Sequence, residues 1–342
     1  MNPTYRGVNL ERITIIGMGP LGASLGLALQ NIRLKNTEVV GHCLNRNLRS
    51  SISKMSAFDS IENNLQKAVD GAQLVVIDAP INESKDLFEL LGSFLSDGSV
   101  VTDMRSSKKR SAAWAEEFLP QSVSYVGGRP IIKKLMNDLE DSSPTLFEGI
   151  NYCVIPSKTA EDQATKTVVG LAESVGSVPY FLDVDEHDSY SAAMDNLPHI
   201  IATAFVNATT SGDSWREMHK SAGGLFDMQS SLSSNDPIDA EVDSLTMSEP
   251  LIYWVDQMIL SLHKLRTELH DDSEDFLESF IHAWEQRARW EADVVDEKVS
   301  MENLPSAAES MASAFLGDRL ARRVTTMGSA DKKESWRYPR GQ

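Results

Sequence analysis

The sequence predicts an α/β domain with a doubly wound parallel sheet, followed by an all-helical part. A glycine-rich turn joins a β-branched run to an apolar helix near residue 17, strand-like and helix-like runs then alternate as far as residue 183, and no convincing strand follows. We therefore expect an α/β domain over residues 1–183, a helical domain over 184–295, and a helical or partly disordered tail over 296–342.

The first expected strand, Ile13 to Ile16, runs directly into a G-x-G-x-x-G turn. The turn residues are Gly17, Gly19, Pro20, Leu21 and Gly22. The first glycine permits a tight turn, the second lets the backbone approach a pyrophosphate, and the third lets helix and strand pack closely. Proline suits the first helical turn, and the helix N-terminus offers N–H groups to phosphates. The pattern predicts a Rossmann domain that binds NAD or NADP. A glycine-rich turn that binds nothing is the alternative.

The strands expected after this turn predict a ligand-binding crevice beside it. The expected strands are residues 38–43, 73–80, 99–104, 122–128, 151–156 and 178–183. Ligands of a doubly wound sheet lie beyond the carboxyl ends of its strands. We therefore expect Pro80 and Asp103 to border the bound cofactor.

The end of the second expected strand bears on the choice of cofactor. Cys43 stands where an NAD-selective domain usually places an acid for the ribose 2′-hydroxyl, and residues 39–58 contain no acid. Arg46 and Arg49 follow and offer charge-assisted hydrogen bonds to a 2′-phosphate. This favours NADP over NAD, with poor discrimination as the alternative.

The region after residue 183 shows helical periodicity. Residues 188–210 predict a long helix with a kink at Pro198, and residues 249–269 and 272–290 repeat apolar residues at three- and four-residue spacing. Residues 306–324 fit one further amphipathic helix in the tail.

Composition narrows the partners. The chain has 342 residues and a net charge of −18, which argues against nucleic acid and anionic membranes. It has neither an apolar run of membrane-span length nor a signal-peptide core, so we expect a cytoplasmic protein. No grouping of side chains has convincing metal-ligand spacing.

Several segments in order resemble the prephenate/arogenate dehydrogenase family of tyrosine biosynthesis. They are GMGPLGASLGLAL (17–29), VVGHCLNRN (39–47), Pro80-Ile81, VVTDMRSSK (100–108), SYVGGRPI (124–131), LFEG (146–149), EHD (186–188), NLPHIIA (196–202), SWREM (214–218) and LFDMQSSLSSNDP (225–237). The resemblance implies a helical domain that forms a homodimer, a small anionic substrate, and NAD(P)-dependent oxidative decarboxylation. It places Ser106 and Lys108 beside the nicotinamide, and Asn196 and His199 at the substrate.

The chain departs from the family pattern in its catalytic turn. The family's Gly-Gly-His-Pro reads Gly127-Gly128-Arg129-Pro130, and arginine cannot act as a general base because it stays protonated. The family's Ser-His-Leu-Pro reads Asp195-Asn196-Leu197-Pro198. Ser231, or Gln229 with a two-residue shift, stands where the family has a carboxylate-binding arginine. We expect Arg129 and Lys134 to serve as anion anchors in a rebuilt pocket.

Three hypotheses follow. The first is a dehydrogenase of this family with an altered substrate pocket, in which Ser106, Lys108 and Arg129 serve catalysis. The second is a catalytically idle dinucleotide-binding protein that has lost the histidine and the carboxylate-binding arginine. The third is a dehydrogenase or reductase of similar architecture that acts on another small anionic substrate.

Overall fold

The computed structural model describes residues 10–34, 36–136, 138–234 and 236–294, and the expected helix over 306–324 lies outside them. The chain divides into two compact units, which meet in sequence between Gln257 and Met258. The first unit contains the sheet and the helices as far as the start of α12, and the second contains the rest of α12 and α13.

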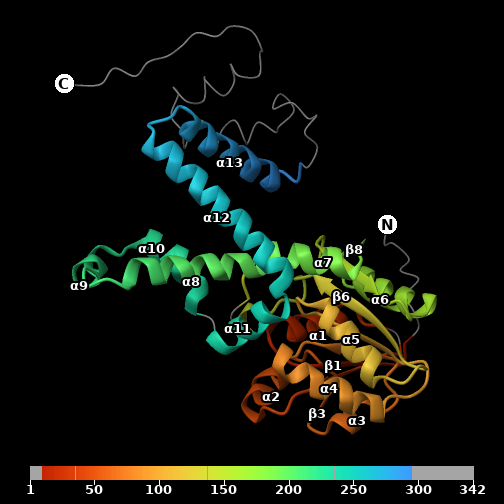
Figure 1. Ribbon diagram of the computed structural model, residues 1–342. Helices are drawn as coiled ribbons and strands as arrows, with labels where there is room; N and C mark the ends of the chain where they lie inside the picture. Colours follow the sequence, from red (N-terminus) through yellow and green to blue (C-terminus); the bar gives the residue numbers. More distant parts are fainter. Residues whose placement is uncertain (1–9, 35, 137, 235, 295–342) are drawn as a thin grey trace, which may run out of the picture. The chain divides into compact units, whose positions relative to one another are not determined.

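The described part of the first unit holds an eight-stranded sheet in the order β3-β2-β1-β4-β5-β6-β7-β8 (Figure 1). The strands are β1 (Arg12–Ile16), β2 (Glu38–His42), β3 (Ser60–Glu62), β4 (Leu74–Ile77), β5 (Val100–Asp103), β6 (Ser124–Pro130), β7 (Asn151–Pro156) and β8 (Val178–Phe181). Neighbouring strands are parallel, except that β6 and β7 are antiparallel. The doubly wound fold class is confirmed. The sequence pattern missed β3, which has three residues and no fully buried side chain.

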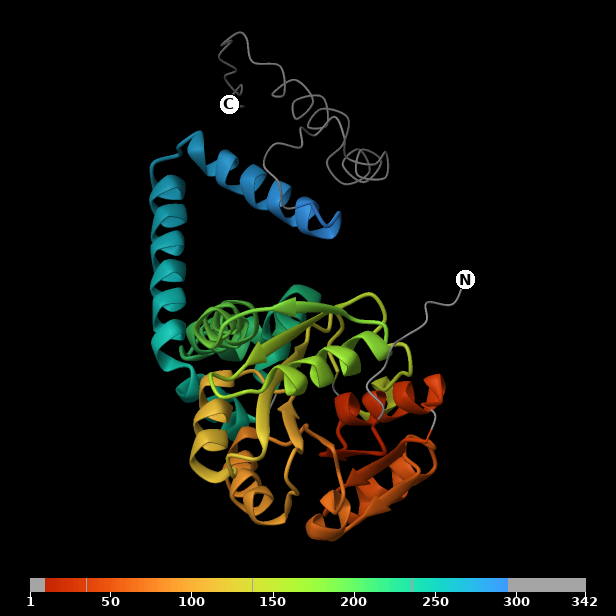
Figure 2. The ribbon, with the colours of Figure 1, turned by 90° about the vertical axis from the view of Figure 1, so that its right-hand side faces the viewer.

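Helices cover both faces of the sheet (Figures 1 and 2). They are α1 (Pro20–Ile32), α2 (Arg46–Ser53), α3 (Leu65–Val69), α4 (Ile81–Phe94), α5 (Lys108–Phe118) and α6 (Asp162–Ser174). Leu25 of α1 and Val168 of α6 belong to the core on one face. Phe88 of α4 and Ala115 of α5 belong to the core on the other. Burial of these two apolar layers fixes the carboxyl ends of β1, β4, β5 and β6, beyond which the candidate site lies.

Helices make up the described chain after β8. They are α7 (Val184–Ser191), the π-helical segment η2 (Ala192–Asn196), α8 (Leu197–Thr210), α9 (Trp215–Met218), α10 (Gly224–Ser230), α11 (Pro237–Thr246), α12 (Ser248–His270) and α13 (Asp275–Glu291), with short 3₁₀ turns η3 (His219–Ser221) and η4 (Ser231–Ser234) between them. Another, η1 (Leu139–Asp141), precedes β7. The helical prediction for this region is confirmed.

The long helix expected over 188–210 contains a widened turn just before Pro198. The N–H of Leu197 bonds to the carbonyl of Ala192, five residues earlier, which is the π-helical spacing. Proline lacks an N–H and its ring crowds the preceding turn, so the wider turn accommodates it. The π segment matters for function because it carries Asp195 and Asn196.

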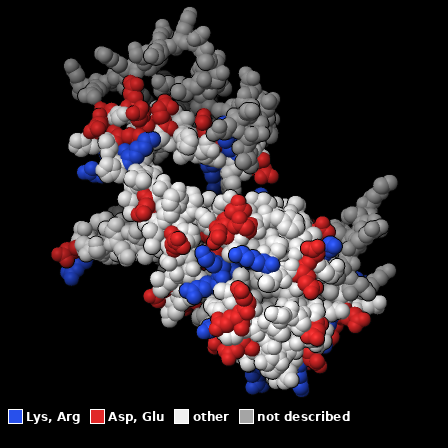
Figure 3. Space-filling model, turned by 45° about the vertical axis from the view of Figure 1, so that its right-hand side comes forward, with Lys and Arg blue, Asp and Glu red and all other residues white. Residues whose placement is uncertain are grey.

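Acidic and basic side chains are interspersed on the surface shown in Figure 3, with basic residues lying next to acidic ones. Among the described residues, no helix combines the length and the apolar character needed to span a bilayer.

Candidate functional site

The glycine loop between β1 and α1 has the geometry that a dinucleotide requires. Gly17 adopts φ +92°, and a Cβ there would lie 2.2 Å from the carbonyl oxygen of Asp78. A Cβ on Gly22 would lie 2.5 Å from the carbonyl oxygen of Gly17. A Cβ on Gly19 would meet, among the described residues other than its chain neighbours, one atom within 4 Å: Oδ2 of Asp78, at 3.7 Å. The loop therefore packs tightly where glycine is needed and stays open beside Gly19. These residues fit a pyrophosphate, as the sequence predicts.

Asp78 is the member of this loop region that sequence reasoning missed. It follows β4 directly, and its Oδ2 accepts a hydrogen bond from the backbone N–H of Gly22 at 2.8 Å, in the first turn of α1. Burial raises its pKa to about 6, while Arg105 and the Gly22 amide act in the opposite direction. The signal was present in the sequence: an acid ends the apolar run Leu74 to Ile77 at the cofactor edge of the sheet.

Two other residues expected at the cofactor lie at the same sheet edge. Arg46 is exposed and begins α2 just beyond β2, where Asn45 caps the helix by accepting from two backbone N–H groups. Pro80 is half-buried and caps α4 just beyond β4. With the glycine loop, they form the carboxyl edge of β1, β2 and β4.

A pocket of about 860 Å³ lies between the segments that follow β5 and β6 and the helices from η2 to α11. It is lined by Met104, Arg105, Ser106, Arg129, Leu135, Met136, Asp195, Asn196, His199, Ser231, Leu232, Ser234, Asp236, Asp239, Ala240, Asp243 and Ser244. The structure thus brings together four of the expected residues: Ser106, Arg129, Asn196 and His199. The lining holds four aspartates and two arginines.

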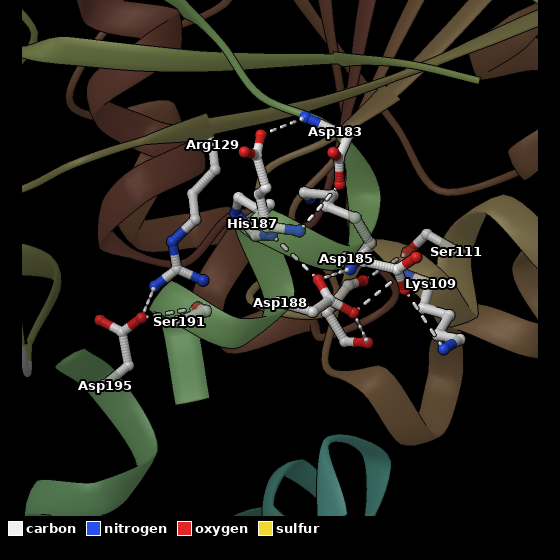
Figure 4. A network of polar contacts seen from close by, with 12 residues as sticks. Lys109, Ser111, Arg129, Asp183, Asp185, His187, Asp188, Ser191 and Asp195 are labelled. Carbon is white, nitrogen blue, oxygen red and sulfur yellow. Dashed lines mark hydrogen bonds and ion pairs between the residues drawn. The ribbon is translucent and has the colours of Figure 1, made fainter. Parts of the chain in front are cut away.

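Arg129 is paired within this pocket. Its guanidinium lies 2.8 Å from Oδ2 of Asp195, and the same oxygen accepts from the Ser191 hydroxyl at 2.7 Å (Figure 4). The π-helical turn of η2 supplies the aspartate, at the position of the serine in the family's Ser-His-Leu-Pro. Arg129 and Asp195 therefore form an ion pair at the two positions where, by the sequence resemblance, we expect the family to have histidine and serine.

Arg105 faces a second acid in the pocket. Its guanidinium lies 3.9 Å from the carboxylate of Asp243, and its Nε is buried without a hydrogen bond. Burial raises the pKa of Asp243; Arg105 opposes this rise and Asp239 adds to it. Asn196 is buried and donates to the Asp243 carbonyl at 3.1 Å, which ties η2 to α11. Sequence reasoning missed these pocket acids, because α11 follows β5 by more than 130 residues.

Asp103 and Lys108 do not line the pocket. The Lys108 ammonium is fully buried, 2.7 Å from the Asp103 carboxylate, which also accepts from Ser111 at 2.9 Å and Tyr125 at 2.7 Å. Burial lowers the pKa of Lys108, and Asp103 partly offsets this. Lys108, Ser111 and Tyr125 thus hold the Asp103 carboxylate in a buried position, and the expected placement of Asp103 and Lys108 beside cofactor and substrate stays a prediction.

Lys134 is also placed away from the pocket lining. Its ammonium is largely exposed and lies 2.6 Å from the carboxylate of Asp141 in η1. Its charge is engaged in a surface ion pair with Asp141, and its role as a substrate anchor stays a prediction.

Asp188 organises the start of α5. Its carboxylate accepts from the backbone N–H groups of Lys108 at 2.8 Å and Lys109 at 3.0 Å, and from the Ser107 hydroxyl at 3.2 Å. His187 contacts the same carboxylate through Nδ1 at 2.9 Å, while its buried Nε2 has no partner (Figure 4). Although burial would raise it, these hydrogen bonds lower the pKa of Asp188 overall. The pair thus has a structural role beside the site.

The fold and the glycine loop define a dinucleotide-dependent oxidoreductase. The chain matches two family descriptions in succession: "Prephenate dehydrogenase, nucleotide-binding domain" over residues 25–180, and "Prephenate dehydrogenase, dimerization domain" over residues 183–283. Together they cover most of the sequence, so the chain belongs to the prephenate dehydrogenase family. Membership makes it an NAD(P)-dependent dehydrogenase of the type found in tyrosine biosynthesis.

Individual relatives agree with this assignment. The chain is 23% identical to prephenate dehydrogenase of Bacillus subtilis over 281 residues, which are 81% of this chain and 75% of that protein. A crystal structure of prephenate dehydrogenase from A. aeolicus, in complex with hydroxyphenyl propionate and NAD⁺, superposes with a TM-score of 0.74 at 23% identity, covering 81% and 97% of the two chains. Arogenate dehydrogenase of Synechocystis superposes with a TM-score of 0.67 at 19% identity, covering 82% and 99%.

Proposed function

We propose that this protein oxidises a cyclohexadienyl substrate whose side chain carries an ammonium group beside its carboxylate, as arogenate does, in preference to prephenate, whose two carboxylates have no ammonium group beside them. The charge balance of the 860 Å³ pocket carries the proposal, because each of its arginines already faces a carboxylate. Both substrates carry two carboxylates, which must compete with Asp195 and Asp243 for these arginines, and prephenate has no cation to offset them. An ammonium group adds a charge that the surplus aspartates can pair with.

The reaction needs few groups from the protein. When bound, the oxidised nicotinamide accepts a hydride from the ring carbinol carbon, and aromatisation drives loss of carbon dioxide. The chain must orient the substrate and accept the proton of its hydroxyl. Arg129 retains N–H groups besides the one facing Asp195, and these can hold a substrate carboxylate.

His199 is our candidate for the proton acceptor. Of the described residues that line the pocket it is the one imidazole, and it makes no hydrogen bond within the described chain. It lies near enough to Asp243 to influence the charge of that carboxylate. Ser106, which also lines the pocket, would hydrogen-bond the substrate hydroxyl. His199 would then replace the histidine whose position Arg129 occupies.

We favour NADP as the cofactor. Arg46 is exposed just after β2, and no acid lies nearby in sequence to repel a 2′-phosphate. Comparison of the dissociation constants of NAD⁺ and NADP⁺ for the wild type and for Arg46→Gln tests this. Loss of the preference in the variant supports it, and equal affinities in the wild type contradict it.

We further propose that the protein is a cytoplasmic homodimer joined through its helical region. The matched dimerization domain supports this, as do exposed apolar side chains within each unit: Leu225 and Met228 on α10, and Leu277 and Phe280 on α13. Light scattering on the full chain measures the assembled mass. A monomer at micromolar concentration contradicts the proposal.

The test of function is reduction of NAD⁺ and NADP⁺ with arogenate and with prephenate in parallel. We expect kcat/KM to be at least about tenfold higher for arogenate, which corresponds to one well-placed ionic contact. Asp243→Asn should narrow this ratio, and Asp227→Asn on α10, which is not among the pocket-lining residues, should leave it unchanged. Preference for prephenate overturns the proposed specificity.

An idle dinucleotide-binding protein is the second candidate. The engaged state of Arg129 favours it, because a donor paired with Asp195 does not replace a catalytic histidine. Dinucleotide binding without turnover of either substrate would support this candidate.

A further inference from the structure

We propose that Asp78 sets the affinity of the glycine loop for dinucleotides, because its carboxylate occupies the anion-binding end of α1 and must be neutralised by a proton when a pyrophosphate binds. This role of Asp78 concerns cofactor binding alone. It therefore stands or falls independently of which substrate the pocket accepts.

The Asp78 carboxylate lies at the N-terminus of α1. Its Oδ2 lies 2.8 Å from the N–H of Gly22, the third helical residue of α1. The same oxygen is the atom closest to the open space beside Gly19, and it also crowds the position of a Cβ on Gly22 at 3.1 Å. The chain thus places its own anion where the glycine loop is shaped to receive phosphates.

A bound pyrophosphate and the Asp78 carboxylate would compete for the same helix N-terminus. A helix N-terminus stabilises one anionic group through its free N–H groups and partial positive charge. A pyrophosphate brings further negative charge to the same few ångströms, and two like charges in one site are not both stable. Binding is then accompanied either by protonation of Asp78 or by its displacement from Gly22, and protonation leaves the side chain in place.

The surroundings offer limited compensation for this charge. Arg105, after β5, is the cation that acts on Asp78, and it also faces Asp243. Tyr152 of β7 has a buried hydroxyl without a hydrogen-bond partner in the described chain, and its pKa is raised by burial and, to a smaller extent, by the nearby Asp78 charge. His42 of β2 directs Nδ1 to the carbonyl of Glu62, towards β3. The pKa of Asp78 is already raised to about 6 in the free protein. A phosphate bound beside it would raise this pKa further, so that Asp78 would take up a proton near neutral pH.

Titration calorimetry of the full-length protein with NAD⁺ between pH 5.5 and 8.5 tests this role. NAD⁺ is the probe because the 2′-phosphate of NADP⁺ titrates near pH 6 and would mask the effect. We expect the dissociation constant of the wild type to rise above pH 6, by up to about tenfold per pH unit. At pH 7.5, the heat measured in two buffers of different ionisation enthalpy should reveal proton uptake approaching one per NAD⁺.

Asp78→Asn separates this role from simple helix capping. The amide oxygen can still accept from Gly22, so the variant mimics the protonated acid. It should bind NAD⁺ with little pH dependence, take up no proton, and at pH 8 bind about tenfold or more tightly than the wild type. Asp59→Asn is the matched control. Asp59 also accepts a backbone N–H at 2.8 Å, from Val39, but it does so near the amino end of β2, at the sheet edge opposite the glycine loop.

Three results would overturn the proposal. One is a wild-type affinity that does not change between pH 5.5 and 8.5. Another is an Asp78→Asn protein that is folded, as judged by circular dichroism, and binds NAD⁺ with the pH dependence of the wild type or more weakly at every pH. An absent response from both proteins at all pH values also overturns it, because the loop would then not be a dinucleotide site.

Discussion

Oδ2 of Asp195 lies between two donors, 2.8 Å from the guanidinium of Arg129 and 2.7 Å from the hydroxyl of Ser191. The pair joins strand β6 to the π-helical turn η2 within the pocket. Two departures from the family pattern, an arginine for a histidine and an aspartate for a serine, are thus one structural feature. Each charge compensates the other, so we expect a change at either position to alter the activity of the pocket.

Arg129→His tests this relationship. The variant restores an imidazole to the catalytic turn but leaves Asp195 without its cation. If the pocket is a decayed dehydrogenase site, kcat with arogenate should rise about tenfold or more, since a positioned general base contributes on that scale or above. If Arg129 has its own role in binding, kcat/KM should fall about tenfold.

The double variant Arg129→His/Asp195→Ser separates these outcomes further. It reinstates both family residues, and a non-additive gain in kcat would confirm that the two positions act as a unit. Steady-state kinetics with arogenate and prephenate supply the measurement. Additive effects would contradict the coupling.

Lys108 and Asp103 should be critical for stability. Lys108→Met leaves the Asp103 carboxylate buried without its cation, and removal of one partner of a buried pair costs about 3–5 kcal/mol. Lys109→Met is the control, because its ion pair with Asp185 is exposed and contributes at most about 0.5 kcal/mol. Urea unfolding of the full chain gives both values, and equal values would contradict the buried-pair interpretation.

Asp188 should stabilise the fold most above its own pKa. Its pKa in the folded protein is lowered, so its stabilising effect is present above the unfolded value of about 4 and is lost as pH falls towards the folded value. We expect Asp188→Asn to lower the free energy of unfolding by about 2 kcal/mol at pH 7, because the backbone N–H groups of Lys108 and Lys109 then lose their charged acceptor. The difference should shrink below pH 4, as urea unfolding at both pH values would show. An unchanged difference would contradict the charge argument.

The sequence predicted what depends on local pattern. The β-branched runs and the glycine fingerprint determine β1, the loop and α1, and these match because burial and backbone sterics act over a few residues. Ser106, Arg129, Asn196 and His199 were placed through motif resemblance, and they do line one pocket.

Other features of the site depend on tertiary contacts. Asp103 and Lys108 were expected at the crevice because they follow β5; the sequence did not show that Tyr125 and Ser111 donate hydrogen bonds to a buried Asp103. Asp239 and Asp243 were missed because their significance depends on neighbours far away in sequence, whereas Asp78 had a local signal at the end of β4. A side chain's position beyond a strand is thus readable from pattern, whereas its direction depends on tertiary partners.

Asp78 should make the unliganded protein lose stability as pH rises. Burial raises the pKa of Asp78 in the folded protein to about 6, above an unfolded value near 4. Its contribution is therefore fully present below pH 4 and is lost as pH rises through 6. Asp78→Asn avoids this loss, and we expect it to be more stable than the wild type by about 2 kcal/mol at pH 8 and nearly equal at pH 4.5.

Urea unfolding without dinucleotide at these two pH values measures the effect of Asp78→Asn, with Asp59→Asn as the control that should gain no stability at pH 8. A simple capping role for Asp78 predicts the opposite sign: the carboxylate would then stabilise the N-terminus of α1, and the asparagine variant would be the weaker protein at pH 8. The sign of the difference at pH 8 thus decides whether Asp78 lowers stability in order to regulate cofactor binding or supports the helix. A retained carboxylate that lowers stability is the pattern expected of a functional residue, because groups at binding sites are often held there at the expense of the fold.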